Sequence, residues 1–264
     1  MSGMNFDLPF MPERTEKPRE TGLTMVMDKG LTILEAEQLI EGSGHLVDII
    51  KLGFGTSIFT PRLKEKIKLF QDNGLKVYPG GTLFEAFVAR NSFDKFQSFM
   101  DEMGFDAVEV SDGSIQINHD DKLNFIRTLA KNRVVLSEVG SKEEGILIAP
   151  AKWISMMNTE LEAGSWKVIA EARESGNVGI YRPNGSAHTV LVNKILNKVK
   201  REDVLWEAPK KPQQVWFIKL LGSDVNLGNI APNDIIPLET LRMGLRGDTF
   251  FEFLPEELVS TFKP

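Results

Sequence analysis

Short runs of apolar residues alternate along the chain with longer segments in which apolar residues recur every three or four positions. The short runs are typical of buried parallel strands, and the longer segments are typical of amphipathic helices that connect one strand to the next. The pattern predicts eight strands, over residues 23–27, 49–52, 76–78, 107–110, 134–137, 168–170, 204–206 and 225–227. It predicts helices over residues 32–42, 61–73, 93–103, 120–131, 154–163, 189–199, 213–221 and 238–245.

Eight strands that alternate with helices, without a linker or a break in composition, predict a single-domain α/β fold, the (β/α)8 TIM barrel. The alternative is an open doubly wound sheet. The first strand is not followed by a GxGxxG motif, which disfavours that alternative. Residues 12–20 are polar and contain prolines, and we expect residues 1–20 to form an N-terminal arm outside the catalytic barrel of residues 21–264.

Composition narrows the class of protein. Of the 264 residues, 42% are hydrophobic and 26% are charged, as in an ordinary globular domain. The chain has no cysteine, which excludes disulfides, thiolate metal ligands and cysteine nucleophiles and is compatible with the cytoplasmic location that we expect. The net charge of −6 and the lack of a basic block argue against nucleic-acid binding. No apolar run approaches the ~18 residues of a membrane span, so no membrane association is expected.

Acidic residues stand at the carboxyl ends of predicted strands four to seven, as Glu109, Glu138, Glu171 and Glu207. A charge on an apolar strand is costly unless it pairs or binds an ion. Any one of them could cap a helix or pair with a lysine, but the carboxyl ends of barrel strands meet at one mouth. Carboxylates without cysteine or a histidine cluster suit Mg²⁺, and we expect Glu109, Glu138 and Glu171 to bind it. The histidines lack ligand spacing and are expected on the surface or in loops, at His45, His119 and His188.

Glycines and cations at the same mouth indicate an anionic substrate. In the sequence Gly80-Gly81-Thr82 the backbone can approach an oxyanion closely, and the helix that follows directs its positive end toward it. Four cationic residues follow or end predicted strands: Lys29, Lys51, Lys142 and Arg173. This mixture suits a small substrate that bears phosphate and carboxylate groups.

Nine blocks of sequence, spread over nearly the whole chain, resemble one enzyme family. They are DKG (28–30), KLGFGTS (51–57), YPGGTLFE (78–85), VEVSDGS (108–114), SEVGSK (137–142), EARESG (171–176), EAP (207–209), SDVNLGNI (223–230) and LETLRMGLRGDTF (238–250). In this order and spacing they closely resemble the phosphosulfolactate synthase family.

The resemblance implies a Mg²⁺-dependent carbon–sulfur lyase with a (β/α)8 barrel, which adds sulfite to phosphoenolpyruvate and gives (2R)-2-O-phospho-3-sulfolactate. In methanogens this reaction belongs to coenzyme M biosynthesis. The resemblance also implies a homo-oligomer, with a trimer as the expected form.

The resemblance further implies roles for individual residues. Lys142 matches a lysine of the family and is the expected general acid, with Lys51 as the rival catalytic lysine. From the glycines and polar residues at the strand ends themselves, the expected substrate-binding residues are Asp28, Lys29, Gly80, Gly81, Thr82, Arg173 and Asn226. Two alternatives stay open: a lyase of this family that adds a different nucleophile to phosphoenolpyruvate, and a non-catalytic, stress-related member that keeps the fold.

Overall fold

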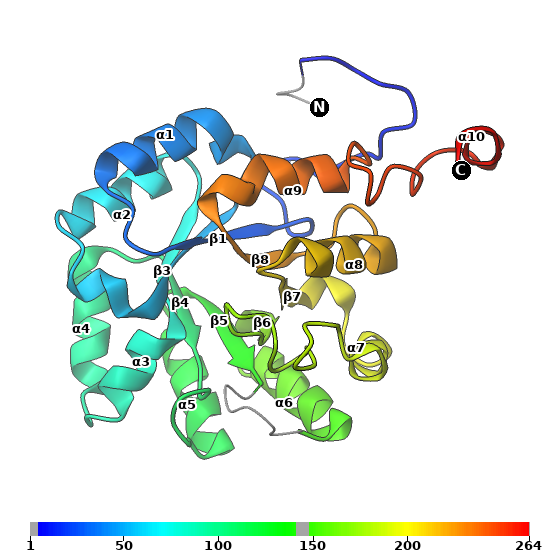
Figure 1. Cartoon of the computed structure of the whole chain (residues 1–264). Helices are drawn as coiled ribbons and strands as arrows, with labels where there is room; N and C mark the ends of the chain where they lie inside the picture. Colours follow the sequence, from blue (N-terminus) through cyan, green and yellow to red (C-terminus); the bar gives the residue numbers. More distant parts are fainter. Residues whose placement is uncertain (1–4, 141–147, 264) are drawn as a thin grey trace.

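Eight parallel strands form a nearly closed barrel at the centre of the molecule (Figure 1). The computed structural model describes residues 5–140 and 148–263. The strands are hydrogen-bonded in the order β3-β2-β1-β8-β7-β6-β5-β4, so the first strand pairs with both the second and the last. Their bounds are β1 Thr24–Asp28, β2 Ile49–Leu52, β3 Lys76–Pro79, β4 Ala107–Val110, β5 Val134–Val139, β6 Ser165–Ala170, β7 Val204–Glu207 and β8 Leu227–Ile230.

The predicted (β/α)8 barrel is confirmed, and the open doubly wound sheet is wrong. The two end strands of the order, β3 and β4, lie next to each other and close the ring. A side chain spans this junction, because the N–H of Val77 donates to Asp106 Oδ1 at 2.9 Å.

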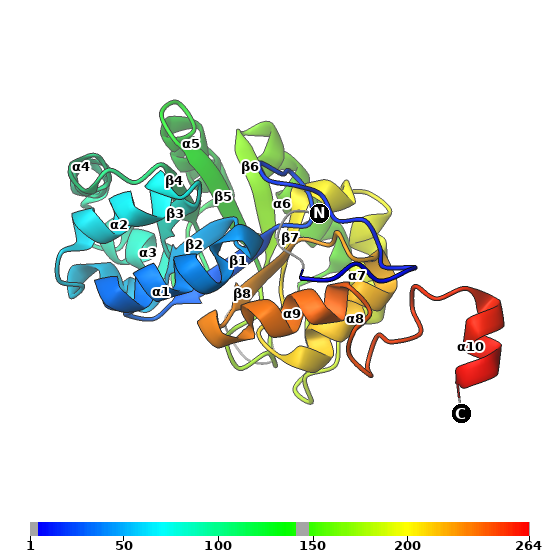
Figure 2. The same ribbon diagram turned by 90° about the horizontal axis from the view of Figure 1, so that it is seen from above.

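Helices surround the barrel on its outer side (Figure 1). The first begins with a capping box, in which the Thr32 hydroxyl accepts from the Glu35 N–H and the Glu35 carboxylate accepts from the Thr32 N–H. Figures 1 and 2 show the last helix set apart from the barrel. The bounds are α1 Ile33–Ser43, α2 Leu63–Asp72, α3 Gly81–Val88, α4 Phe93–Met103, α5 His119–Leu129, α6 Pro150–Glu162, α7 Thr189–Leu196, α8 Lys211–Leu221, α9 Ile235–Arg242 and α10 Glu256–Phe262.

The core has two layers because successive side chains of a strand point to opposite faces of the sheet. The larger layer packs the outward strand faces against the helices, with Trp206, Phe217 and Trp153 among its largest members. The inner layer fills the barrel with seven strand side chains and Leu23: Met25, Ile49, Tyr78, Ala107, Leu136, Ile169 and Leu205. The barrel is therefore a packed interior and not a pore, and polar groups inside it are confined to the strand ends.

The last strand lies two to three residues later than the predicted 225–227, at Leu227–Ile230. Asn226 is the reason. Its side chain binds the main chain beside the amino ends of β1 and β7, accepting from Leu23 N and donating to the carbonyls of Glu202 and Val204. The paired segment begins only after this residue and includes Gly228 and Asn229, which do not look like strand residues in the sequence.

The described part of the arm, from residue 5 to residue 20, binds at the amino ends of the strands. Arg14 donates to the carbonyl oxygens of Gly22 and Ser223 and pairs with Glu239 on α9. Glu20 accepts a hydrogen bond from Trp166 Nε1 at 2.6 Å, at the start of β6. In the described ranges no helix is long and apolar enough to cross a membrane.

Candidate active site

Four glutamates and one lysine meet inside the carboxyl end of the barrel. Lys51 of β2 lies with its Nζ 2.8 Å from Glu109 Oε2, 3.3 Å from Glu207 Oε1 and 3.7 Å from Glu138 Oε2. Glu171 follows the last residue of β6, and all five side chains are buried. We call Glu109, Glu138, Glu171 and Glu207 the glutamate ring. The ring and Lys51 would carry a net charge of −3 if all five groups were ionised (four carboxylates and one ammonium).

The ring keeps Lys51 protonated. Burial alone would lower the pKa of Lys51, but the charges of Glu109, Glu207 and Glu138 outweigh burial and raise that pKa well above its ordinary value. Lys51 is therefore a fixed cation, unsuited to giving up a proton near neutral pH.

For Glu207, burial outweighs the groups that favour its charged form, so its pKa is raised. Burial raises its pKa from 4.5 to about 7, aided by the charges of Glu138 and Glu109. The ammonium of Lys51 and the N–H of Ala172, which donates to Glu207 Oε2 at 2.7 Å, act in the opposite direction. One carboxyl of the ring therefore changes its charge near neutral pH when no other cation is bound.

Three members of the ring can hold a metal ion. Glu138, Glu171 and Glu207 each offer a carboxylate oxygen, and these oxygens lie within 4.8 Å of one another. We call these three the carboxylate triad. Buried oxygens without sulfur or imidazole are the donor set of a hard cation such as Mg²⁺, so the residues fit the predicted ion. Glu138 and Glu171 were predicted as ligands from the sequence; Glu207 was not.

Glu109 lies outside this triad because two other groups bind it. Its Oε2 pairs with Lys51, and its Oε1 accepts from the Gly81 N–H at 2.7 Å. A Cβ on Gly81 would lie 2.2 Å from Ser111 Oγ and 2.6 Å from Glu109 Oε1. Gly81 is thus required for the close approach of Glu109, and its N–H is already used within the protein. That differs from the expectation that Gly81 binds a substrate anion.

Asp28 lies on the outer side of β1 and not in the mouth. Its Oδ2 pairs with Lys66 of α2 at 2.7 Å, and its Oδ1 accepts from the N–H groups of Gly30 and Leu31. Both side chains of the ion pair are buried. Asp28 therefore holds the loop after β1, and its carboxylate does not face the glutamate ring.

Other predicted residues lie around the mouth. Lys29 and Arg173 are exposed on the loops after β1 and β6, and Lys29 pairs with Glu174 between these loops. Thr82 is exposed in the first turn of α3. Gly80, which precedes this helix, lies close to Lys51, since a Cβ on Gly80 would be 3.3 Å from Lys51 Cε. Lys142 lies outside the described residues, so its expected role stays a prediction.

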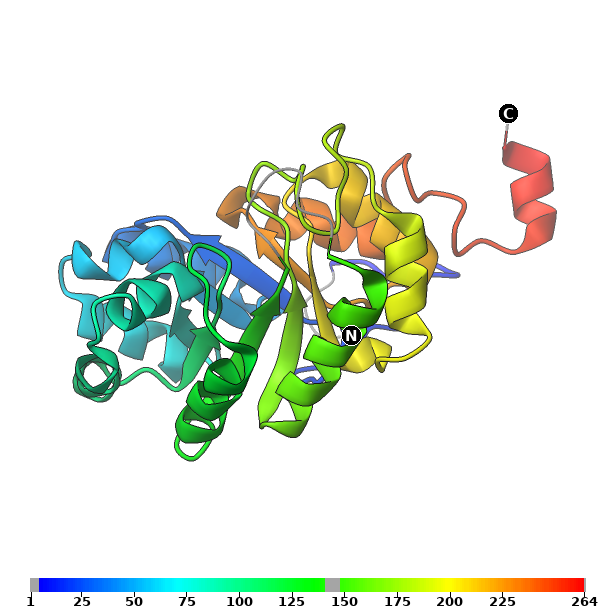
Figure 3. The same cartoon turned by 90° about the horizontal axis from the view of Figure 1, so that it is seen from below.

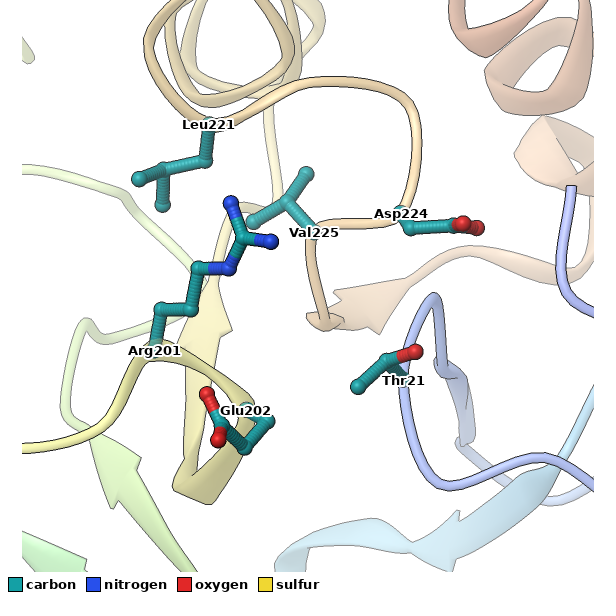
Figure 4. A pocket seen from close by; sticks show the side chains of 6 residues that line it. All are labelled: Thr21, Arg201, Glu202, Leu221, Asp224 and Val225. Carbon is teal, nitrogen blue, oxygen red and sulfur yellow. The ribbon is translucent and has the colours of Figure 1, made fainter. Parts of the chain in front are cut away.

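Asn226 is at the opposite end of the barrel, as its contacts with the amino ends of the strands show. It is therefore not brought together with the other predicted substrate-binding residues. A cavity of about 130 Å³ lies at the same end (Figure 4), away from the glutamate ring. It is lined by Thr21, Arg201, Glu202, Leu221, Asp224 and Val225.

Sequence reasoning missed Glu207 as a ligand and Tyr78 as a neighbour of the ring. Tyr78 pairs in register with Lys51. Its pKa is raised well above the ordinary value by burial and by the charge of Glu109, so the phenol stays protonated. The sequence did contain a signal for Glu207, since it is the last residue of an apolar strand, and the other ring members lie within or just after the carboxyl-terminal part of theirs. Nothing in the strand sequence distinguished it from Glu109.

Comparison with known proteins agrees with the motifs. A model of the (2R)-phospho-3-sulfolactate synthase (ComA) family matches residues 12–248. The phosphosulfolactate synthase of Methanocaldococcus jannaschii is 43% identical over 237 residues, which are 88% of this chain and 94% of that protein. The enzyme of Methanothermobacter thermautotrophicus is 41% identical (90% and 95% covered), and that of Bacillus subtilis is 37% identical (91% and 97% covered).

Among solved structures, 3-hexulose-6-phosphate synthase from Salmonella typhimurium matches with a TM-score of 0.55 at 15% identity. The match covers 85% of this chain and 100% of that chain, and it shows the shared barrel fold alone.

The raised pKa of Glu207 predicts how the metal-free protein responds to pH. Between pH 4.5 and about 7 the folded state keeps a proton on Glu207 that the unfolded state has released. The free energy of unfolding should therefore fall as pH rises through this window, by up to about 3 kcal/mol. In Glu207→Gln this fall should largely disappear, whereas the exposed Glu102→Gln should keep it. Urea denaturation from pH 4.5 to 8 measures this, and an unchanged slope in Glu207→Gln would show that Glu207 does not titrate there.

Proposed function

The chain belongs to the phosphosulfolactate synthase family, and on this premise we propose that it catalyses the Mg²⁺-dependent addition of sulfite to phosphoenolpyruvate, giving (2R)-2-O-phospho-3-sulfolactate. The observation that supports the proposal most strongly is the buried carboxylate triad beside Lys51 at the carboxyl end of the barrel. This is the end at which barrel enzymes carry out their chemistry.

The proposed reaction forms one carbon–sulfur bond. The sulfur lone pair of sulfite attacks the methylene carbon of phosphoenolpyruvate, and the electrons of the double bond move toward the neighbouring carbon and its carboxylate. A proton is then added to the carbon that bears the phosphate. When bound, Mg²⁺ supplies positive charge where negative charge develops on the substrate.

The residues have separate tasks in this proposal. Glu138, Glu171 and Glu207 would hold the ion, each through one buried carboxylate oxygen. Lys51 balances the charge of the ring and keeps its carboxylates in place. Lys142 protonates carbon, as the family resemblance implies. The exposed cations Lys29 and Arg173, together with Thr82, bind the phosphate or the incoming sulfite at the mouth.

A direct assay tests the function. We expect consumption of phosphoenolpyruvate only when sulfite and Mg²⁺ are both present, and loss of activity on exhaustive chelation. Glu138→Gln should lower the rate at least 100-fold, because one of three carboxylate charges on the ion is removed. A panel of other nucleophiles belongs in the same assay. Consumption that needs another nucleophile, or that persists after chelation, would contradict the proposal.

The two candidate catalytic lysines should behave differently. Lys142→Met should fold and bind Mg²⁺ and phosphoenolpyruvate, while kcat falls about 10²–10⁴-fold through loss of the general acid. Lys51→Met leaves three buried carboxylates without their cation, so we expect a loss of stability of about 3–5 kcal/mol. Lys152→Met, exposed on α6, is the control for both. Full activity of Lys142→Met together with an inactive but stable Lys51→Met would reverse the assigned roles.

We include a homo-oligomer, expected as a trimer, in the proposal. A groove of about 680 Å³ runs between the arm and α9 and is bordered by apolar side chains, with Phe6 76% and Ile236 53% exposed. A second copy of the chain is the occupant we propose for it. Light scattering should give three times the chain mass of 29.6 kDa, and Ile236→Glu should reduce it, whereas Val190→Glu on α7 should not. A monomeric wild type would refute the assembly.

A further inference from the structure

The main-chain carbonyl oxygen of each residue in the carboxylate triad is bound by a group from outside the barrel interior. A bound carbonyl fixes the peptide plane that follows it, and with that plane the direction of the residue's side chain. The three hydrogen bonds are Lys122 Nζ to Glu138 O (2.6 Å), Ile180 N to Glu171 O (3.0 Å) and Tyr181 Oη to Glu207 O (2.7 Å).

Lys122 binds the β5 end from α5. Its side chain is fully buried. Its ammonium donates to Glu138 O and, at 2.8 Å, to Asp112 Oδ1, and it forms an ion pair with Glu160 Oε1 at 2.9 Å. Burial lowers the pKa of Lys122, but the two carboxylates outweigh burial and raise that pKa. The ammonium thus joins the loop after β4, helix α6 and the main chain of one triad residue at a single point.

Tyr181 and Ile180 bind the other two triad residues from the segment between β6 and α7, which forms part of the loop layer at one end of the strands (Figure 3). Tyr181 is buried, and Gln213 of α8 donates to the carbonyls of two glycines of this segment. Gly179 has a φ of +65°, and a Cβ there would lie 2.0 Å from Glu171 O. Only glycine lets the chain approach so closely that Ile180 N–H reaches that carbonyl.

We infer that Lys122 and Tyr181 are positioning residues, which set the spacing of the carboxylate triad by holding the backbone of Glu138 and Glu207. The inference rests on the proposed function, because it takes the triad as the Mg²⁺ site. Each side chain acts through the peptide carbonyl of a triad residue, Lys122 on Glu138 O and Tyr181 on Glu207 O. Groups that orient metal ligands in this indirect way typically change metal affinity or activity about 10–100-fold when removed.

Tyr181→Phe tests the inference most directly, because it removes the hydroxyl group and leaves the aromatic side chain packed in place. We expect a dissociation constant for Mn²⁺ about 10-fold or more above that of the wild type, measured by electron paramagnetic resonance of the free ion without substrate. Lys122→Met should weaken Mn²⁺ binding at least as much. If Lys122→Met does not fold, Tyr181→Phe still decides the matter.

Lys66→Met is the matched control. Lys66 is also a buried lysine on an outer helix that binds a carboxylate, Asp28, and a carbonyl, Leu31 O at 2.8 Å, but it does not contact the triad. It should lower the melting temperature and leave Mn²⁺ affinity within about twofold. Wild-type affinity in folded Tyr181→Phe would overturn the inference, as would an equal loss of affinity in Lys66→Met. A wild type that binds no Mn²⁺ would instead refute the metal site of the proposed function.

Discussion

The structure depends on the cost of gathering four carboxylates inside one end of an apolar barrel. In a poorly solvated site, like charges repel strongly and each ion loses its hydration. In the described part of the chain, the ammonium of Lys51, the N–H of Gly81 on Glu109 and the N–H of Ala172 on Glu207 offset part of this cost. These interactions do not fully compensate burial and the repulsion between carboxylates, so the pKa of Glu207 is raised to about 7. A bound divalent cation would relieve the same imbalance, which explains why the arrangement suits a metal enzyme better than an inert core.

The rest of the barrel confines this charge to one end. The middle of the barrel is filled by apolar side chains, so polar groups of the strands are found where the strands end. At the amino end the arm contacts Trp166, where Glu20 accepts a hydrogen bond from the indole N–H. The exposed cations Lys29 and Arg173 lie on the loops after β1 and β6, at the opposite end of the barrel.

Buried ion pairs on the outer face of the barrel hold the loops at the carboxyl ends of the strands in place. Lys66 with Asp28 holds the loop after β1, and Lys122 with Asp112 holds the loop after β4 while also binding the end of β5. These pairs use the same residue types as the glutamate ring but lie between a strand and a helix, where they fix the positions of the loops. The chain thus has buried charges in two places, in the glutamate ring inside the barrel and in ion pairs that hold loops outside it.

The sequence by itself determined the alternation of strands and helices, the family and the presence of acidic residues near the carboxyl ends of the strands. These follow from local periodicity and from long motifs, which do not depend on distant contacts. It did not determine which charged residues face inward. Parallel strands are buried on both faces, so their apolar runs do not reveal the direction of a side chain. Barrel closure and loop contacts decided that Glu207 joins the triad in place of Glu109, that Asp28 faces outward, and that Asn226 lies at the far end.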